Sequence, residues 1–511
     1  MSGNDVLRGL EAAEHVKPSF AEAKRPLTAV LILPPDWGAV GSLVARYSES
    51  GGIGFKPPQG ILYVATALHA FSPHRAHVID ALAEGLSFEA LARRVAELRP
   101  DVVGISAWTD WWWPAWRTGE AIKRSLPDTH LVYGGPHLGI YPQETLDHPF
   151  VDSVIVGDGE MPFLYLCNML ANGIKDPDFP GLHFKEHGIK PPPGTFFIQK
   201  DLDALPHPDR RLLPIRNYSS VLAKSAYVTT MITSRGCPHQ CTFCKLNFQK
   251  TLSRSAESVA AEFAEIQALG IHEVEIYDDT FTSSRKRVEA ICTQLIANGN
   301  RVEWAIRDRV NNADPELLAL MRRAGCRRVH YGVESGSQAV LDLMRKHTTP
   351  DKARQAIRAA KDAGLTVLAF FMLGNVGETQ DDMRTTIDFA VELDPDFAEF
   401  SITIPYPGTE MYRQCLADGT IQSDYWAAFA RRPEENFRPP RLVESHATRE
   451  QLVAMRNRAV RKFYLRPKYL WKALREVSSL GELTRKALMG LRLVNSAYTP
   501  FSPYSRRDQE P

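Results

Sequence analysis

The feature that most constrains the fold is an alternation of apolar strands and amphipathic helices across residues 227–410. Its first strand, YVTTMITS at 227–234, runs directly into Cys237-Pro-His-Gln-Cys241-Thr-Phe-Cys244. Helices expected at 255–270, 285–299, 314–325, 350–364 and 379–395 lead to strands expected at 273–281, 302–310, 327–335, 366–379 and 397–410. These six β/α units are too few to close an eight-stranded barrel. The sequence therefore predicts a partial (β/α)6 barrel with an open side.

A second alternation occupies residues 28–173. Strands are expected at 28–35, 75–82, 101–107, 130–137 and 151–160, with helices at 60–71, 87–100, 113–127 and 161–173 between and after them. This order predicts an α/β, doubly wound, Rossmann-like parallel sheet. Ligands bind such sheets beyond the carboxyl ends of the strands, and glycines there let a large ligand approach the backbone.

The remaining segments divide the chain into five parts. Residues 1–27 form a lead-in, 28–173 the first domain, 174–223 a proline-rich linker, 224–415 the barrel, and 416–511 a mostly helical C-terminal region with a flexible tail. The linker is also expected to lie over the joint between the domains. In the C-terminal region, 424–437 and 466–494 mix basic, aromatic and aliphatic residues at helical spacing. We favour the interpretation that these helices cap the open side of the barrel. The alternative is that they bind a membrane surface.

Composition excludes several classes of protein. The chain has 511 residues, 44% of them hydrophobic and 24% charged, with a net charge of +1. These values are ordinary for a globular protein and give no reason to expect a nucleic-acid partner. No apolar signal segment or run of 18 apolar residues occurs, which predicts a cytoplasmic protein. The scattered cysteines Cys167, Cys292, Cys326 and Cys415 are expected to be inert core residues.

The cysteine triplet indicates a metal centre. Three thiolates, Cys237, Cys241 and Cys244, can hold three irons of a [4Fe–4S] cluster and leave the fourth iron open to another ligand. The alternative is a structural zinc site, which typically has four ligands. His239 is the candidate fourth ligand, but it lies inside the gap between two of the cysteines.

With the triplet directly after a first barrel strand, residues 224–415 resemble the radical S-adenosylmethionine (SAM) superfamily. The resemblance implies that SAM chelates the open iron and that the reduced cluster cleaves SAM to methionine and a 5′-deoxyadenosyl radical. It also implies an external electron donor of the flavodoxin or ferredoxin type. The cofactor carries this chemistry, and the protein positions it.

The same resemblance implies a SAM site at the strand ends. Asp278 and Asp279 stand where many members have Gly-Gly-Glu, so which carboxylate holds the SAM amino group stays open. Arg307 is expected to pair with the SAM carboxylate. The remaining SAM-binding candidates are Phe243, Glu334, Ser335 and Gly374. Surface salt bridges are the alternative for the charged residues, and no catalytic residue is assigned.

Residues 28–172 resemble a cobalamin-binding domain of the kind fused in front of radical SAM enzymes. The resemblance rests on ILPP, PPQGILYVATAL, VGISAWT, VYGGPH and VIVGDGE, in that order. No Asp-x-His-x-x-Gly occurs, so the lower face of cobalt is left to water, a non-ligating side chain or nothing. The implied cobalamin-binding residues are Gly60, Ser106, Trp108, Gly134, Gly135, Pro136, His137, Gly157 and Glu160.

Five tryptophans follow the third strand of this domain, at positions 108, 111, 112, 113 and 116. Most are expected to pack against the sheet or a domain interface. Trp108 is the candidate for a residue that lies against the corrin ring and keeps water from cobalt. His137 is expected to be a polar strand-end residue near the cofactor tail.

The two resemblances together imply C-methylation of a poorly activated carbon of a small molecule, a lipid or a tetrapyrrole. One SAM would methylate cobalt, and a second would generate the radical that activates the substrate. The chain is also similar to the anaerobic magnesium-protoporphyrin monomethyl ester cyclase group, so radical cyclisation or rearrangement without methyl transfer is an alternative. A non-catalytic cobalamin-binding protein is a third, disfavoured because such a protein needs no open iron.

Overall fold

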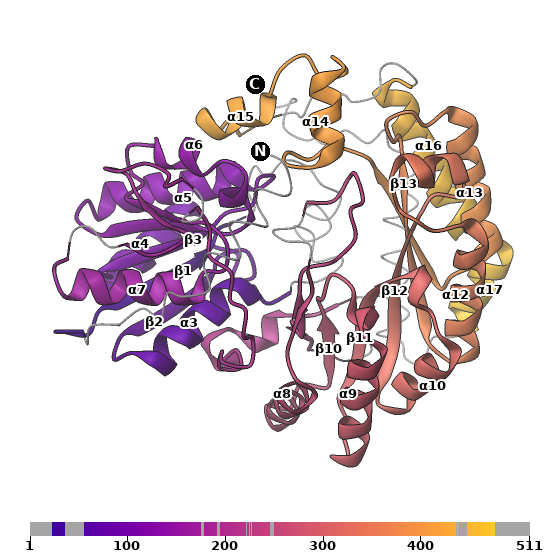
Figure 1. Cartoon of the computed structure of the whole chain (residues 1–511), viewed down its shortest axis with the longest axis horizontal. Helices are drawn as coiled ribbons and strands as arrows, with labels where there is room; N and C mark the ends of the chain where they lie inside the picture. Colours follow the sequence, from indigo (N-terminus) through magenta and orange to yellow (C-terminus); the bar gives the residue numbers. More distant parts are fainter. Residues whose placement is uncertain are drawn as a thin grey trace.

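The computed structural model describes residues 23–35, 56–174, 178–191, 195–220, 222–223, 225, 227–245, 250–435, 437 and 447–475. Figure 1 shows two α/β bodies side by side, the first in indigo and purple and the second running from magenta to orange. Most of the expected lead-in, most of the helix expected at 466–494 and the tail after Pro500 lie outside the described residues.

The first body is built on a sheet of order β2-β1-β3-β4-β5-β6. The mutually parallel strands are β1 (Thr28–Leu33), β2 (Arg75–Asp80), β3 (Val102–Ser106), β4 (His130–Gly134) and β5 (Ser153–Ile155). Consecutive residues of β1 alternate between two separate cores, Leu31 on one face and Ile32 on the other. Helices α3 (Gln59–Phe71) and α7 (Glu160–Ala171) cover the Leu31 face, and α4 (Phe88–Leu98) and α5 (Trp112–Ser125) cover the Ile32 face. The doubly wound prediction is confirmed.

The proline-rich segment adds to this sheet and spans the joint. β6 (Leu182–Phe184) pairs antiparallel with β5, and the short helices η3 (Arg210–Leu212) and η4 (Ile215–Asn217) follow. Arg210 lies buried against the second body, where it donates to Thr229 and to Glu262. The segment therefore lies over the joint and does not merely link the two bodies.

The second body is a sheet of six parallel strands, ordered β14-β13-β12-β11-β10-β7, which does not close on itself. The strands are β7 (Thr229–Met231), β10 (Glu273–Ile276), β11 (Glu303–Arg309), β12 (Cys326–Glu334), β13 (Thr366–Leu373) and β14 (Phe397–Ile402). The outer helices are α8 (Ala256–Ala268), α9 (Arg285–Ala297), α10 (Pro315–Arg323), α12 (Pro350–Asp362) and α13 (Gln380–Leu393). The predicted partial barrel is confirmed, with these helices around its convex side (Figure 1).

Several strands end earlier than the sequence predicted. The strand expected at 227–234 is divided into β7 and the short β8 (Ser234–Arg235), which pairs with β9 (Leu252–Ser253). The strand expected at 366–379 stops at Leu373, because Gly374 takes a left-handed conformation with φ +78°. β14 ends before Pro405, which has no backbone N–H to donate to a ladder.

The described part of the C-terminal region packs on both bodies. α15 (Tyr425–Arg431) joins the α4–α5 core of the first body, as does α14 (Glu410–Ala417), which directly follows the barrel strands. α16 (Arg449–Tyr464) packs on β14 and α13 and is followed by α17 (Pro467–Arg475). α16 thus lies on the outer surface of the barrel, while α14 and α15 bridge the two bodies (Figure 1). Among the described helices, none is long and apolar enough to cross a membrane.

Candidate active site

The start of the cysteine loop is held by two adjacent aspartates at the end of β10. Asp278 is buried and accepts hydrogen bonds from Thr233 N at 2.6 Å, Thr233 Oγ1 at 2.5 Å and Ser234 Oγ at 2.7 Å. Asp279 is exposed and accepts one bond from Gly236 N at 2.9 Å. Both oxygens of Asp278 are therefore occupied by the loop, which gives this residue a structural role in place of the SAM contact that the sequence predicted. Asp279 is the carboxylate of this pair that remains accessible.

The three cysteines follow within this anchored loop. Cys237 and Cys241 are buried, and Cys244 is exposed. Desolvation and the neighbouring Cys241, with smaller effects of Asp279 and Cys237, raise the pKa of the Cys244 thiol to about 12. Within the described chain, no three His, Cys, Asp or Glu side chains are gathered to hold a single metal ion. The donor set of three thiols in one loop fits three corners of an iron–sulfur cluster.

Arg309, at the end of β11, is a functional candidate that the sequence analysis missed. Its Nη1 donates to Cys241 Sγ at 3.3 Å, and its Nη2 donates to the carbonyl of Lys346. The side chain is buried, so its positive charge acts on the sulfur with little screening. The guanidinium therefore contacts the sulfur of a predicted cluster ligand directly. The signal available in the sequence was the alternation of β11, which places Arg309 on the same face as Arg307.

The concave face of the barrel carries charged side chains. The Arg307 guanidinium lies 3.7 Å from the centre of the Tyr277 ring, in an Arg–π contact. Its charge acts on two carboxyl groups, Asp279 and Glu399 of β14. Desolvation raises the pKa of Glu399, and Arg307 and Arg456 oppose that shift. The structure thus brings two candidates, Asp279 and Arg307, together and adds Glu399 to them.

Glu334 takes a rare backbone conformation at the end of β12. Its φ is +68°, and its Oε1 accepts a bond from Lys346 Nζ at 2.6 Å in a buried pair. A Cβ added at Gly332 would lie 2.4 Å from the same Oε1, so a larger residue there would displace the Glu334 carboxylate. Lys346 Nζ also lies 5.6 Å from the centre of the Phe243 ring. The pair therefore places the expected adenine contact, Phe243, beside the expected SAM contact, Glu334.

Two other predicted SAM contacts have different surroundings. Ser335 is fully buried, and its hydroxyl lies 2.9 Å from Thr386 Oγ1 in α13. A Cβ at Gly374 would lie 2.8 Å from Leu452 of α16, so protein fills the space expected for adenine. The Ser335 hydroxyl and the Cβ side of Gly374 therefore face helices, and the SAM contacts of these two residues stay predictions.

The glycines near the carboxyl edge of the first sheet differ in the space beside them: some face free space, and others pack against backbone atoms. A Cβ built at Gly60 or at Gly134 meets no atom of the described residues within 4 Å. A Cβ at Gly135 would lie 2.7 Å from the Ala107 carbonyl, and one at Gly157 would lie 2.0 Å from the Phe197 carbonyl. Both residues have φ near +100°, so they are required by the fold itself. Gly134 ends β4 beside half-buried Ser106, which ends β3, and leaves room for a ligand at this edge.

Some aromatic residues at this edge are exposed to a ligand, and others are buried in the core. Trp108 is 47% exposed, which suits a residue that contacts a large flat ligand. Trp112 is fully buried and donates from Nε1 to the carbonyl of Ala430 in α15 at 3.0 Å. His137, which follows Pro136, stacks on Trp112 at 4.3 Å between ring centres, and burial lowers its pKa to about 3. His137 is therefore a neutral core residue and does not face the ligand side.

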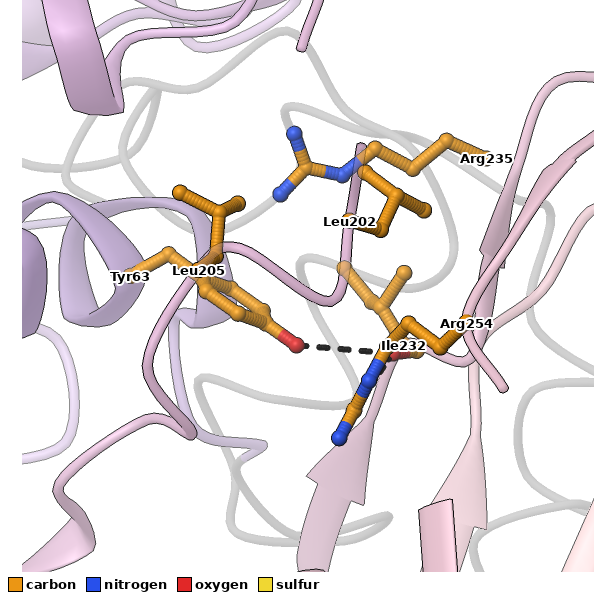
Figure 2. Close-up of a pocket in the computed structure, with 6 residues that line it drawn as sticks. All are labelled: Tyr63, Leu202, Leu205, Ile232, Arg235 and Arg254. Atoms are coloured by element: carbon orange, nitrogen blue, oxygen red, sulfur yellow. Dashed lines mark hydrogen bonds between the residues drawn. The ribbon is translucent and has the colours of Figure 1, made fainter. Parts of the chain in front are cut away.

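Side chains of α3 and the segment before it fasten the first body to the barrel. Gln59 Nε2 donates to the Thr230 carbonyl at 2.8 Å, and Lys56 pairs with Glu275 at 2.9 Å. Tyr63 donates to the Ile232 carbonyl at 3.4 Å, across a small hollow lined also by Leu202, Leu205, Arg235 and Arg254 (Figure 2).

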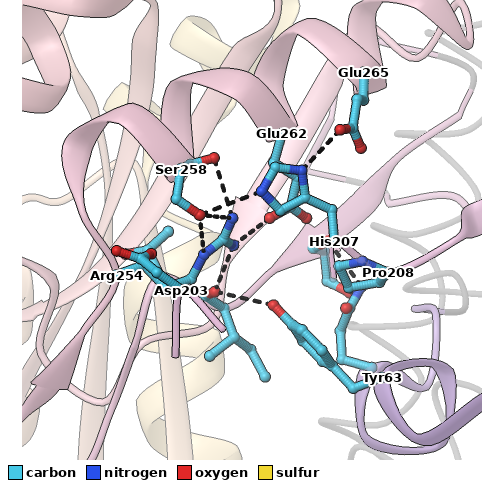
Figure 3. A network of polar contacts seen from close by, with 12 residues as sticks. Tyr63, Asp203, His207, Pro208, Arg254, Ser258, Glu262 and Glu265 are labelled. Carbon is cyan, nitrogen blue, oxygen red and sulfur yellow. Dashed lines mark hydrogen bonds and ion pairs between the residues drawn. The ribbon is translucent and has the colours of Figure 1, made fainter. Parts of the chain in front are cut away.

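The joint continues into a buried ionic network. Glu262 of α8 is fully buried and accepts bonds from Arg254 and from Arg210, while His207 reaches Glu265 and Ser258 nearby (Figure 3). The two arginines together lower the pKa of Glu262 despite its burial. Removal of one partner would leave an unpaired buried charge and strongly destabilise the protein. The network therefore holds the proline-rich segment in one position on the barrel.

Comparisons with known proteins define the class of this fold and site. Residues 231–390 match the model of the radical SAM superfamily, and residues 54–166 match the model of the B12 binding domain. The solved structure of the cobalamin-dependent S-adenosylmethionine radical enzyme OxsB, with aqua-cobalamin and S-adenosylmethionine bound, superimposes with a TM-score of 0.70 at 14% identity. It covers 97% of this chain and 77% of that chain.

Two curated relatives extend over most of the sequence. The uncharacterized methyltransferase PH0819 of Pyrococcus horikoshii is 33% identical over 468 residues, covering 90% of this chain and 97% of its own. The anaerobic magnesium-protoporphyrin IX monomethyl ester cyclase of Cereibacter sphaeroides is 28% identical over 443 residues, covering 82% and 69%. The chain belongs to the cobalamin-dependent radical SAM enzymes, and its cofactors are a [4Fe–4S] cluster, SAM and cobalamin.

Proposed function

We propose that this enzyme transfers a methyl group to a poorly activated carbon of a small molecule that carries a charged group. The observation that carries this proposal is that the start of the cysteine loop meets the segment after β5 across the joint, where Arg235 lies 2.6 Å from Glu160. Tyr406, after β14, donates to Asp110, after β3, at 3.4 Å, so barrel and first body meet at these edges. The name of the P. horikoshii relative supports methyl transfer.

The proposed cofactor contacts follow from the donors present. Cys237, Cys241 and Cys244 would hold the cluster, and Asp279, Arg307, Phe243 and Glu334 would hold SAM. Gly60, Gly134, Ser106 and Trp108 would border the corrin ring. When bound, the cluster supplies the electron that cleaves SAM, and cobalamin supplies the methyl group. Arg309 donates a hydrogen bond to a cluster ligand, and Trp108 excludes water.

The side chains on the concave face of the barrel favour a charged small molecule as the substrate, rather than a lipid. Glu275, Arg307, His330 and Glu399 all point into this face, while Phe370 and Met372 of β13 supply an apolar strip. A cationic substrate group that pairs with Glu399 would be oriented without burying an unpaired charge. We place the protein in the cytoplasm, with a flavodoxin- or ferredoxin-type donor, because the cluster needs low-potential electrons.

Product analysis with methyl-deuterated SAM tests this proposal. Anaerobically reconstituted enzyme is incubated with a reductant, labelled SAM and candidate charged small molecules, with lipids and tetrapyrroles as comparison sets. Deuterium in a product is the expected result. 5′-Deoxyadenosine formed with an altered but unlabelled product would favour cyclisation or rearrangement, for which the similarity to the C. sphaeroides cyclase is the present support. No 5′-deoxyadenosine under strong reduction would contradict both.

A further inference from the structure

Arg235 joins the two loops to which the cofactors are assigned. It ends β8 and stands two residues before Cys237. Its side chain crosses the joint, where Nη1 lies 3.1 Å from Asp158 Oδ1 and Nη2 lies 2.6 Å from Glu160 Oε1. Both carboxylates belong to the Gly157-Asp158-Gly159-Glu160 segment after β5, where the sequence predicted cobalamin contacts. The structure thus gives Glu160 a partner in the barrel.

The surroundings of Arg235 make this contact rigid. The side chain is 16% exposed, and its guanidinium lies 5.3 Å from the centre of the Tyr63 ring (Figure 2). Glu160 is buried, and its second oxygen, Oε2, has no hydrogen-bond partner within the described residues. One planar guanidinium that binds two carboxylates has a fixed orientation, which a lysine ammonium would not impose.

Both ends of the bridge are themselves anchored. On the barrel side, Gly236 N donates to Asp279, directly after the arginine. On the other side, Asp158 accepts a bond from Gln199 N at 2.8 Å, which ties it to the segment across the joint. A displacement of one loop is therefore transmitted to the other through a short chain of charged contacts.

We propose that Arg235 is a positioning residue that sets the separation and orientation of cobalamin relative to the iron–sulfur cluster. This inference rests on the cofactor placement proposed above. The pairs Gln59–Thr230 and Lys56–Glu275 also join the bodies, but they hold the barrel strands and not the cysteine loop. Reactions between bound groups are sensitive to placement, and an error of about 1 Å can cost roughly 100-fold in rate.

Substitutions at Arg235 separate positioning from general stability. R235M removes both ion pairs, and R235K keeps the charge without the fork. R431M is the matched control, because Arg431 pairs with Glu144 at 3.0 Å and also bridges the first body and the C-terminal region, but on the exposed surface. Each variant is loaded with cluster and cobalamin, and cobalamin and iron contents are measured. Electron paramagnetic resonance then records the magnetic interaction between cob(II)alamin and the reduced cluster.

We expect the unchanged protein to show a split or broadened signal. R235M should retain both cofactors with a weaker interaction, R235K should be intermediate, and R431M should match the unchanged protein. A spectrum of R235M identical to that of the unchanged protein would overturn the proposal, as would an equal change in R431M. If R235M does not fold, E160Q removes one charge with little change in shape and is judged by the same criteria. The spectrum needs no substrate, so a failure to detect methyl transfer leaves this test intact.

Discussion

The two sheets of this enzyme offer ligands different surfaces. Strands of the first sheet are apolar on both faces, as Leu31 and Ile32 illustrate, because helices cover both sides. Strands of the barrel sheet are apolar outward, whereas their inward face mixes charged side chains with a few apolar ones such as Phe370. In β10, Val274 lies in the outer core while Glu275 points inward to Lys56 and Arg328. The first sheet can therefore bind a ligand only at its edge, whereas the barrel can bind at its edge and on its concave face.

This difference supports the proposed placement of the cofactors. A large flat ring needs an edge with open glycines, which Gly134 and Gly60 provide. A cluster and a small charged ligand need thiols and charges converging from several strands, which the barrel provides.

Replacement of Cys241 with alanine should abolish activity. The variant loses one of three cluster ligands, so we expect no cluster absorption and no detectable 5′-deoxyadenosine. Cys326→Ala is the control, since this thiol lies in the outer core of the same sheet. Visible spectra and product analysis measure the result, and a C241A protein that still cleaved SAM would refute the cluster assignment.

Phe371 and Phe370 compare the two faces of one barrel strand. Phe371 is fully buried and stacks on Phe400 at 5.3 Å between ring centres, so F371A should cost about 3–5 kcal/mol of unfolding free energy. Phe370 is half-buried on the concave face, and F370A should cost clearly less. Urea denaturation measures both values. Equal losses would mean that the concave face is part of a closed core.

Burial of Glu378 at the edge of the barrel should make the unfolding free energy depend on pH. The side chain is fully buried, and desolvation raises its pKa to about 7 from 4.5, although Asn375 N donates to Oε2 at 2.8 Å. The folded state therefore holds this proton up to about pH 7, and the unfolded state loses it above 4.5. The unfolding free energy should fall as the pH rises from about 5 to 7.

The variant E378Q removes this titration. At pH 8 it should be more stable than the unchanged protein by up to about 3 kcal/mol, and the difference should disappear near pH 4. Denaturation at several pH values measures the difference. A constant difference across the range would mean that Glu378 does not take up the proton in the folded state.

Arg309 gives the smallest expected effect. Loss of its bond to Cys241 should make the cluster harder to reduce, so R309Q should show a more negative midpoint potential and roughly tenfold slower SAM cleavage. Arg285→Met, an exposed arginine of α9, is the control. Potentiometric titration decides, and an unchanged potential in R309Q would restrict Arg309 to a packing role.

The succession of strands and helices along the chain could be predicted from sequence, because the hydrophobic period determines it. The cysteine triplet could be identified as a cluster site, because its three residues lie close together in the sequence. The roles of Asp278 and Asp279 could not, since the two are adjacent in sequence but face different partners. Gly374 seemed open because Leu452, which fills its space, comes 78 positions later in a separate helix. Arg235 and Arg309 were missed for the same reason: their partners are distant in sequence.

The central claim is that cobalamin and the cluster face one another across the joint of the two bodies. Electron paramagnetic resonance of the unchanged enzyme, holding cob(II)alamin and the reduced cluster, tests it most directly. We expect one cobalamin and one [4Fe–4S] cluster per chain, with a magnetic interaction that splits or broadens both signals. Two full-strength signals without any interaction would contradict it.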